Sequence, residues 1–198
     1  MRLLAVDGSP TGGGRTELVL RAVLDASRSA GAETELVALA ERAPGVAEGE
    51  FGRVAEADLG RVAEVVARLE HVDGVVLGSP VYRASFAWPL KVLFDHLPRG
   101  MWGETSAPLR GKPVATVMTG ASLHHFLALN DLRNVLATFF AAHVVPPGLY
   151  VPRDGFGVDG GGLTEPYVGQ AELTGRALVE LAAFLPTTRS LRALEPQA

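Results

Sequence analysis

A short segment near the N-terminus, Gly8–Thr16, combines glycines, hydroxyl groups and an arginine in a way that could bind a phosphate. Its glycines allow the backbone to turn amide groups toward a ligand. Ser9, Thr11 and Thr16 supply hydroxyls, and Arg15 supplies a planar fork of donors. A predicted helix begins at its end, which adds free amides and the positive end of a helix dipole.

The spacing within this segment limits the kind of phosphate. Gly8 and Gly13 stand at the Walker A distance, but Gly14 occupies the place of the lysine. Pro10 replaces the second glycine of the dinucleotide fingerprint. A nucleoside triphosphate or a classical dinucleotide is therefore disfavoured, and a monophosphate fits better. The alternative is a surface loop capped by Thr16 that binds nothing.

A second segment, Gly78-Ser-Pro-Val-Tyr-Arg-Ala-Ser85, follows an apolar run and precedes an amphipathic run at 86–97. That order predicts a strand, a loop and a helix. Pro80 has a fixed φ and no amide hydrogen, so the residues after it could present backbone donors to a planar ligand. In an open α/β sheet both segments lie at the carboxyl edge of the strands, where ligands bind.

Alternating apolar and amphipathic runs predict the elements that position these segments. We expect strands at 3–7, 33–39, 75–77, 113–119 and 144–151, and helices at 16–30, 54–70, 86–97, 122–142 and 167–185. Pro146 and Pro147 mark the last strand as an edge or a bulge. The pattern predicts an α/β fold with a doubly wound, five-stranded parallel sheet in the order 2-1-3-4-5. One domain, 1–186, and a loose tail, 187–198, are expected. Loops are expected at 40–52 and in the glycine-rich segment 155–162.

Composition excludes several classes of function. A net charge of -4 without a basic tract argues against nucleic acid as a partner. No apolar run could span a bilayer, so no membrane partner is expected. The absence of cysteine removes disulfides, thiol nucleophiles and thiolate metal sites. His124 and His125 are adjacent and point in different directions on a helix, so no metal site is expected. We expect a cytoplasmic protein.

Several motifs together resemble one family. They are Gly8-Ser-Pro10 with Arg15-Thr16, Gly78–Phe86, Leu90-Lys91, Asp95-His-Leu-Pro98, and Thr119-Gly120 with His125-Phe-Leu-Ala128. Over most of residues 1–155 the chain resembles the NAD(P)H-dependent FMN reductases of flavodoxin-like fold. It is most similar to the branch that supplies reduced flavin to two-component sulfonate monooxygenases.

The resemblance implies an NAD(P)H:FMN oxidoreductase that transfers a hydride from nicotinamide to FMN, for a monooxygenase partner or a small acceptor such as a quinone. A flavodoxin-like electron carrier with bound FMN is the alternative. The residues implied in cofactor binding are Ser9, Thr11, Arg15, Thr16, Pro80, Val81, Tyr82, Arg83, Ser85, Thr119, Gly120 and Ser122. Arg15 and Arg83 are the candidates for the 2′-phosphate of NADPH. No catalytic acid or base is expected, because the hydride transfer is the cofactors' own chemistry.

One departure from the family pattern concerns the helix at 122–142. The sulfonate-system reductases carry a one-residue insertion there that forms a π-bulge, and the junction Asn130-Asp131 lacks it. An uninterrupted helix is therefore expected, with FMN held as a tight prosthetic group. Large apolar residues in the helices at 86–97 and 122–142 predict a homodimer or homotetramer.

Overall fold

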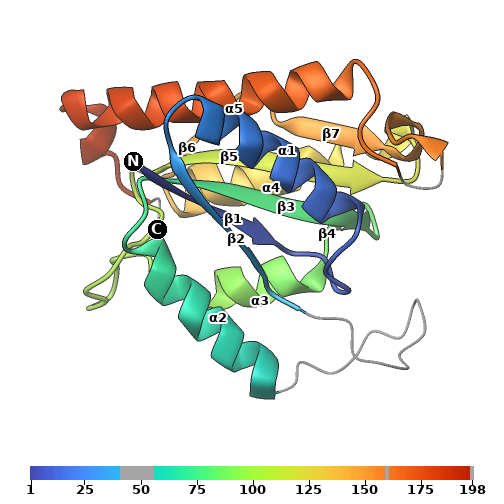
Figure 1. Ribbon diagram of the computed structural model, residues 1–198. Coiled ribbons are helices and arrows are strands. Elements are labelled where there is room, and N and C mark those ends of the chain that lie inside the picture. The colour runs from blue at the N-terminus through green and yellow to red at the C-terminus, as the bar shows by residue number, and fades with distance from the viewer. Residues whose placement is uncertain (41–55, 159–160, 197–198) are drawn as a thin grey trace.

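The computed structural model describes residues 1–40, 56–158 and 161–196. Its centre is a sheet in the order β2-β1-β3-β5-β6 (Figure 1). The strands are β1 (Arg2–Asp7), β2 (Glu33–Ala38), β3 (Gly74–Tyr82) and β5 (Pro113–Gly120), with short strands β6 (His143–Val144) and β7 (Leu149–Pro152). All of these pairs are parallel. The predicted doubly wound order 2-1-3-4-5 is confirmed.

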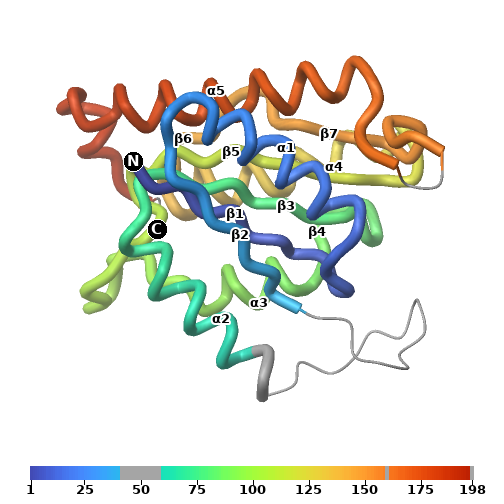
Figure 2. Tube along the Cα trace, in the orientation of Figure 1, coloured from blue at the N-terminus to red at the C-terminus, as the bar shows by residue number. Residues whose placement is uncertain are grey.

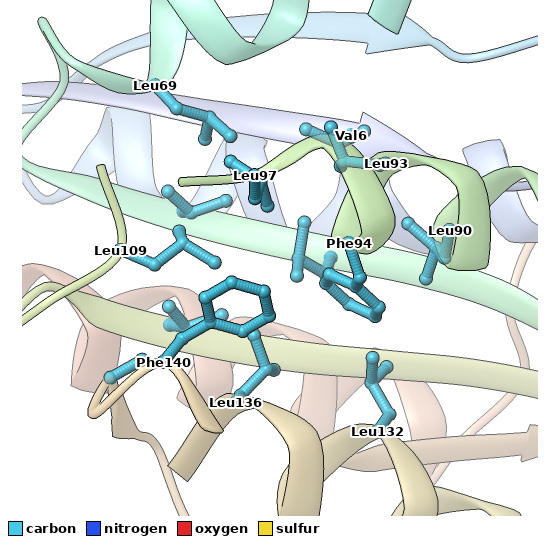
Figure 3. Close-up of a cluster of buried hydrophobic side chains, with 14 of the residues drawn as sticks. Val6, Leu69, Leu90, Leu93, Phe94, Leu97, Leu109, Leu132, Leu136 and Phe140 are labelled. Carbon is cyan, nitrogen blue, oxygen red and sulfur yellow. The ribbon is translucent and has the colours of Figure 1, made fainter. Parts of the chain in front are cut away.

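Helices cover both faces of the sheet. Helices α1 (Arg15–Ser29) and α5 (Tyr167–Phe184) lie together on one face (Figures 1 and 2). Helices α2 (Glu56–Leu69), α3 (Trp88–His96) and α4 (Ala128–Asn134) lie on the other. Alternation along β1 feeds two cores: Leu4 and Val6 join the α2–α3–α4 side, drawn in Figure 3, whereas Leu3 and Ala5 join the α1–α5 side.

The fifth position of the sheet is divided between two strands. β6 pairs with the start of β5, and β7 pairs with its end. Pro146 and Pro147 lie between them and have no amide hydrogen to give to a ladder. The predicted edge position is confirmed, whereas the division of the single expected strand into two was not predicted.

The segment predicted as a loop after β3 is a β-hairpin. β3 continues to Tyr82, the chain turns at Arg83-Ala84 with φ of 52° and 65°, and β4 (Ser85–Phe86) pairs back antiparallel. Two residues with positive φ make a type of turn that suits a tight hairpin. The expected strand end near residue 77 and helix start at Phe86 are therefore wrong, because Gly78–Pro80 stay paired with β5.

The helix expected at 122–142 is interrupted. A 3₁₀ turn (Leu123–His125) precedes α4, and a π-helical turn (Val135–Phe139) follows it. Phe140 N donates a hydrogen bond to Val135 O at 3.3 Å. The Thr138 hydroxyl donates one to Asn134 O at 2.5 Å. A hydroxyl that bonds back to the i−4 carbonyl competes with the α-helical ladder. The expectation of an uninterrupted helix without a π-bulge is therefore wrong.

The remaining expectations concern loops and the tail. The loop predicted at 40–52 and the helix start at Val54 fall almost entirely outside the described residues. Around the glycine-rich segment, Gly157 N donates to Gly162 O at 3.0 Å. The tail holds 3₁₀ turns at Leu185–Thr187 and Leu191–Ala193, and the domain boundary at residue 186 stays a prediction. Within the described parts of the chain, no helix has the length and apolar character needed to cross a membrane.

Candidate functional site

Three strand ends meet at the carboxyl edge of the sheet. Gly8 N donates to Gly78 O at 2.8 Å, so the N-terminal loop starts against β3. Pro80 and Thr119 are register partners in β3 and β5. The hydroxyls of Thr16 and Thr119, both buried, lie 2.9 Å apart and share a hydrogen bond. These contacts join the N-terminal loop, the hairpin and the segment after β5 into one region.

The N-terminal loop has the geometry of an anion cradle. Gly12 and Gly13 have φ of 56° and 61°, and successive left-handed residues turn backbone amides toward one side. Gly14 is the N-cap of α1 and gives the first turn no side-chain hydrogen bond. The amides of that turn therefore remain suited to a ligand with acceptor oxygens. The loop fits a phosphate group.

Ser9 and Thr11, two of the predicted ligands, lie close together in this loop. Their hydroxyl oxygens are 3.3 Å apart, and Thr11 N donates to Ser9 Oγ at 3.4 Å. Ser9 is buried, and its own amide donates to Asp7 Oδ1 at 2.8 Å. The carboxyl group of Asp7 therefore binds the backbone of the residue that carries one of these two hydroxyls.

Asp7 was missed by the interpretation of the sequence. Its side chain is fully buried, and Oδ2 has no hydrogen-bond partner within the described part of the chain. Burial raises the pKa of Asp7 to about 6, and Glu17 adds to that rise, while the Ser9 amide opposes it. An acidic residue that ends an apolar strand just before a glycine-rich loop was the available signal.

Beside this loop lies a cavity of about 890 Å³. Arg15 and Ser122 line it, and they are the only two of the twelve predicted site residues that do. The Arg15 guanidinium lies 5.4 Å from the centre of the Phe156 ring, and Ser122 Oγ lies 3.3 Å from His124 Nδ1. The lining also includes Arg153 and Asp154. His124, Arg153 and Phe156 were not predicted, since they follow β5 and β7 in segments without a motif.

Tyr150 on β7 fixes the segment after β5. Its hydroxyl donates to Ser122 O at 2.5 Å, and burial raises its pKa. A Cβ atom on Gly120 would lie 2.0 Å from that hydroxyl, so only glycine fits. Gly120 and Ser122 were predicted, but the tyrosine that positions them was not.

The hairpin presents the other predicted residues. Val81, Tyr82 and Ser85 are half-buried on its two strands, and Arg83 is exposed at the turn. Ser79, which was not predicted, ties the two ends of the hairpin together, because its hydroxyl accepts a 2.8 Å hydrogen bond from Ala87 N. These residues stand beside the cavity rather than in its lining.

The apolar residues that suggested an oligomer divide into two groups. Most of them lie in the monomer's own core: Leu90, Leu93, Phe94, Leu129, Leu132, Leu136 and Phe140. Phe139 and Leu127 are exposed, as are Leu123, Phe126 and Trp102, which is 82% exposed. The Arg99 guanidinium lies 3.4 Å from the centre of the Phe139 ring and 5.6 Å from that of Trp102. We call these five exposed side chains the apolar patch.

In residues 1–40, 56–158 and 161–196, no three His, Asp or Glu side chains gather in a way that could hold a metal ion. The candidate site is thus built from backbone amides, hydroxyls and arginines around one sheet edge.

Comparison with known proteins agrees with this geometry. A model of the NADPH-dependent FMN reductase family matches residues 1–155. The NADH-dependent FMN reductase SfnF of Pseudomonas putida is 32% identical over 186 residues, which are 93% of this chain and 92% of that protein.

Solved structures show the same fold. The apo form of the NADH:FMN oxidoreductase EMOB superposes with a TM-score of 0.70 at 22% identity, over 96% of this chain and 93% of that one. An archaeal flavodoxin gives a TM-score of 0.58 at 13% identity, over 92% and 99% of the two chains. With FMN as its flavin and NAD(P)H as its reductant, the chain belongs to the NADPH-dependent FMN reductase family.

Proposed function

We propose that the Gly8–Thr16 loop holds the phosphate of FMN, and that the hairpin and the Gly120–Ser122 segment hold its ring. The hydrogen bond between Thr16 and Thr119 carries this proposal, because it fixes the start of α1 against the end of β5. Ser9, Thr11 and Arg15 then supply phosphate donors. Pro80, Val81, Tyr82, Arg83 and Ser85 border the ring on one side, and Thr119, Gly120 and Ser122 on the other.

When bound, FMN supplies the chemistry of hydride acceptance from a reduced nicotinamide. The chain's part is to bind and orient. Gly12 and Gly13 shape the phosphate loop through their positive φ angles, and Tyr150 holds Ser122 in place. No side chain is required to move a proton, which agrees with a site made of amides, hydroxyls and arginines. Arg15 and Arg83 are our candidates for the 2′-phosphate of NADPH.

The acceptor of the electrons follows by analogy. We propose reduced flavin for a monooxygenase partner, or reduction of a small acceptor such as a quinone, in the cytoplasm. The relative SfnF is described as NADH-dependent and the family as NADPH-dependent, so both nicotinamides are candidates.

Initial-rate measurements test this function. Oxidation of NADPH or NADH by the purified protein should require added or retained FMN. Parallel lines against nicotinamide at several acceptor concentrations would indicate a ping-pong order with FMN retained. Intersecting lines with flavin-free protein would indicate FMN as a substrate. We expect retention with parallel lines, because the Asn130-Asp131 junction lacks the family's inserted residue. An absence of nicotinamide oxidation with FMN present would overturn the proposal.

A flavodoxin-like electron carrier is the second candidate, supported by the archaeal flavodoxin's similar fold. The reductase EMOB superposes more closely. A carrier would bind FMN but would not oxidise NAD(P)H at a catalytic rate, so the same assay separates the two.

We also propose that the protein is a homodimer or homotetramer assembled through the apolar patch. An exposed tryptophan and several other exposed large apolar side chains suit burial against a second copy. Light scattering should therefore give a multiple of the chain mass of 20.8 kDa. A monomer mass at micromolar concentration would contradict the proposal.

A further inference from the structure

We propose that Asp7 is a specificity-determining residue, whose buried carboxyl group couples binding of the FMN phosphate to uptake of one proton. The inference rests on the proposed role of the Gly8–Thr16 loop as the phosphate site. When ionised, Asp7 carries a negative charge that opposes binding of a phosphate by this loop.

The position of Asp7 places its side chain under the loop. β1 alternates between the two cores, and Leu3 and Ala5 belong to the core beneath α1 and α5. Asp7 follows in the same alternation and therefore faces α1. Its Oδ1 atom accepts the amide of Ser9, which is itself a predicted phosphate ligand. The carboxyl group is thus one hydrogen bond away from the proposed phosphate site.

Among the residues that the structure describes, no cation is paired with this carboxyl group. Its strand partners are Ala38 in β2 and Gly78 in β3, which carry no charge. From α1 the charged neighbour is Glu17, a second carboxylate, which accepts from Gly13 N and pairs with Arg21. Arg15 extends over the Phe156 ring. Within the described residues, Oδ2 has no partner at all.

A phosphate monoester brings between one and two negative charges near pH 7. Two anions in a partly desolvated site repel strongly, and the arrangement is relieved when the carboxyl group takes up a proton. Since burial already raises the pKa of Asp7 to about 6, that proton is readily bound. FMN affinity should then fall as pH rises above about 6. Riboflavin has no phosphate, so its affinity should not follow this slope.

The test is a fluorescence titration of flavin-free protein with FMN and with riboflavin between pH 5.5 and 8.5. For the wild-type protein we expect FMN affinity, relative to riboflavin, to fall about tenfold per pH unit once the carboxyl group must be protonated on binding. Asp7→Asn keeps an acceptor for Ser9 N and cannot ionise. The FMN affinity of this variant, relative to riboflavin, should not change with pH. At pH 8 its FMN affinity should exceed that of the wild type at least tenfold. Asp25→Asn, which removes an exposed carboxylate on α1, is the matched control.

Calorimetry of the wild-type protein in buffers of different ionisation enthalpy keeps the test decisive if Asp7→Asn does not fold. FMN should bind with net proton uptake at pH 7.5, and riboflavin should not. If FMN affinity depended on pH equally in the wild type and in Asp7→Asn, or if FMN bound without proton uptake, the role of Asp7 would be overturned. The phosphate assignment of the loop would still stand. If FMN were never preferred over riboflavin at any pH, the phosphate assignment of the loop would fail, and this inference with it.

Discussion

The two edges of the sheet each carry an ionisable group that is removed from water, Lys112 partly and Asp7 fully, and the two groups differ in their partners. At the amino edge, Lys112 precedes β5, and its ammonium group donates to Leu69 O. Burial lowers the pKa of Lys112, while the nearby carboxylates of Glu70 and Asp73 oppose that change. At the carboxyl edge, the Asp7 carboxyl group accepts one hydrogen bond, its Oδ2 atom has no hydrogen-bond partner among the described residues, and Glu17 is a neighbour of like charge.

This difference separates a structural group from a functional one. A charged group that is partly removed from water but keeps its partners in the chain is explained by those surroundings. A buried charge that lacks them costs stability, and such cost is concentrated at functional sites. Lys112 is of the first kind and Asp7 is of the second. The predictions below test that assignment.

The largest effect is expected from Gly120→Ala at the carboxyl edge. The new methyl group would overlap the Tyr150 hydroxyl, which is 2.0 Å from its position. We expect a loss of about 3 kcal/mol in the free energy of unfolding, as in overpacked sites, together with loss of flavin binding. Urea titration and flavin fluorescence measure the two effects. Combining Gly120→Ala with Tyr150→Phe should restore part of the stability and part of the flavin binding. As the control, Gly60→Ala on an exposed face of α2 should lower neither the free energy of unfolding nor flavin affinity.

Asp7→Asn should stabilise the flavin-free protein at neutral pH. Burial raises the pKa of Asp7 to about 6 in the folded protein, from 3.8 for an aspartate in water. Below pH 3.8 the group is protonated in both states and costs nothing. Between pH 3.8 and 6 the unfolded state ionises first, so the wild type loses stability, up to about 3 kcal/mol above pH 6. Asn cannot ionise and avoids that loss. Equal unfolding curves for the two proteins at pH 8 would contradict this account.

Arg15→Ala should weaken FMN binding by about 2 kcal/mol, because a charge-assisted bond to phosphate contributes about 1.5–3 kcal/mol. Riboflavin should lose far less. Arg28→Ala, an exposed arginine at the other end of α1, serves as the control. If both flavins weakened equally, Arg15 would be placed at the ring or in the wall of the cavity rather than at the phosphate.

The smallest effect is expected from Lys112→Met at the amino edge. The aliphatic part of the side chain is kept, and the ammonium bond to Leu69 O and the attraction to Glu70 and Asp73 are lost. We expect a change of about 1 kcal/mol in the free energy of unfolding and no change in flavin affinity at any pH. A pH-dependent loss of FMN binding in this variant would show that the two edges are coupled and would undo the comparison.

Local patterns in the sequence predicted the layers and the strand order, because apolar runs and helical periodicity are properties of neighbouring residues. They also placed the last strand at the edge of the sheet, because the missing amide hydrogens of Pro146 and Pro147 are visible in the residue type. The extension of β3 to Tyr82 was not predictable in this way. It depends on pairing with β5, more than thirty residues later. The turn at Arg83-Ala84 also lacks the Asn-Gly signal that usually marks such a hairpin.

The candidate site was predicted as a set of motifs but not as an arrangement. The bond between Thr16 and Thr119 joins residues 103 positions apart, so no local pattern reports it. Asp7 was missed for a similar reason, since its burial requires α1 and two neighbouring strands to be in place. The π-helical turn depends on competition for Asn134 O by the Thr138 hydroxyl, which a register comparison of the helix does not reveal.

The contrast between the two tryptophans gives the protein its own optical markers. Trp88 is half-buried at the start of α3, close to the hairpin, whereas Trp102 stands in solvent over Arg99. An indole in water emits at longer wavelength and is open to collisional quenching by iodide. Burial of Trp102 between copies would shift its emission to shorter wavelength and shield it from iodide. In a Trp88→Phe variant, Trp102 is the remaining tryptophan, and its emission wavelength would report association without any label.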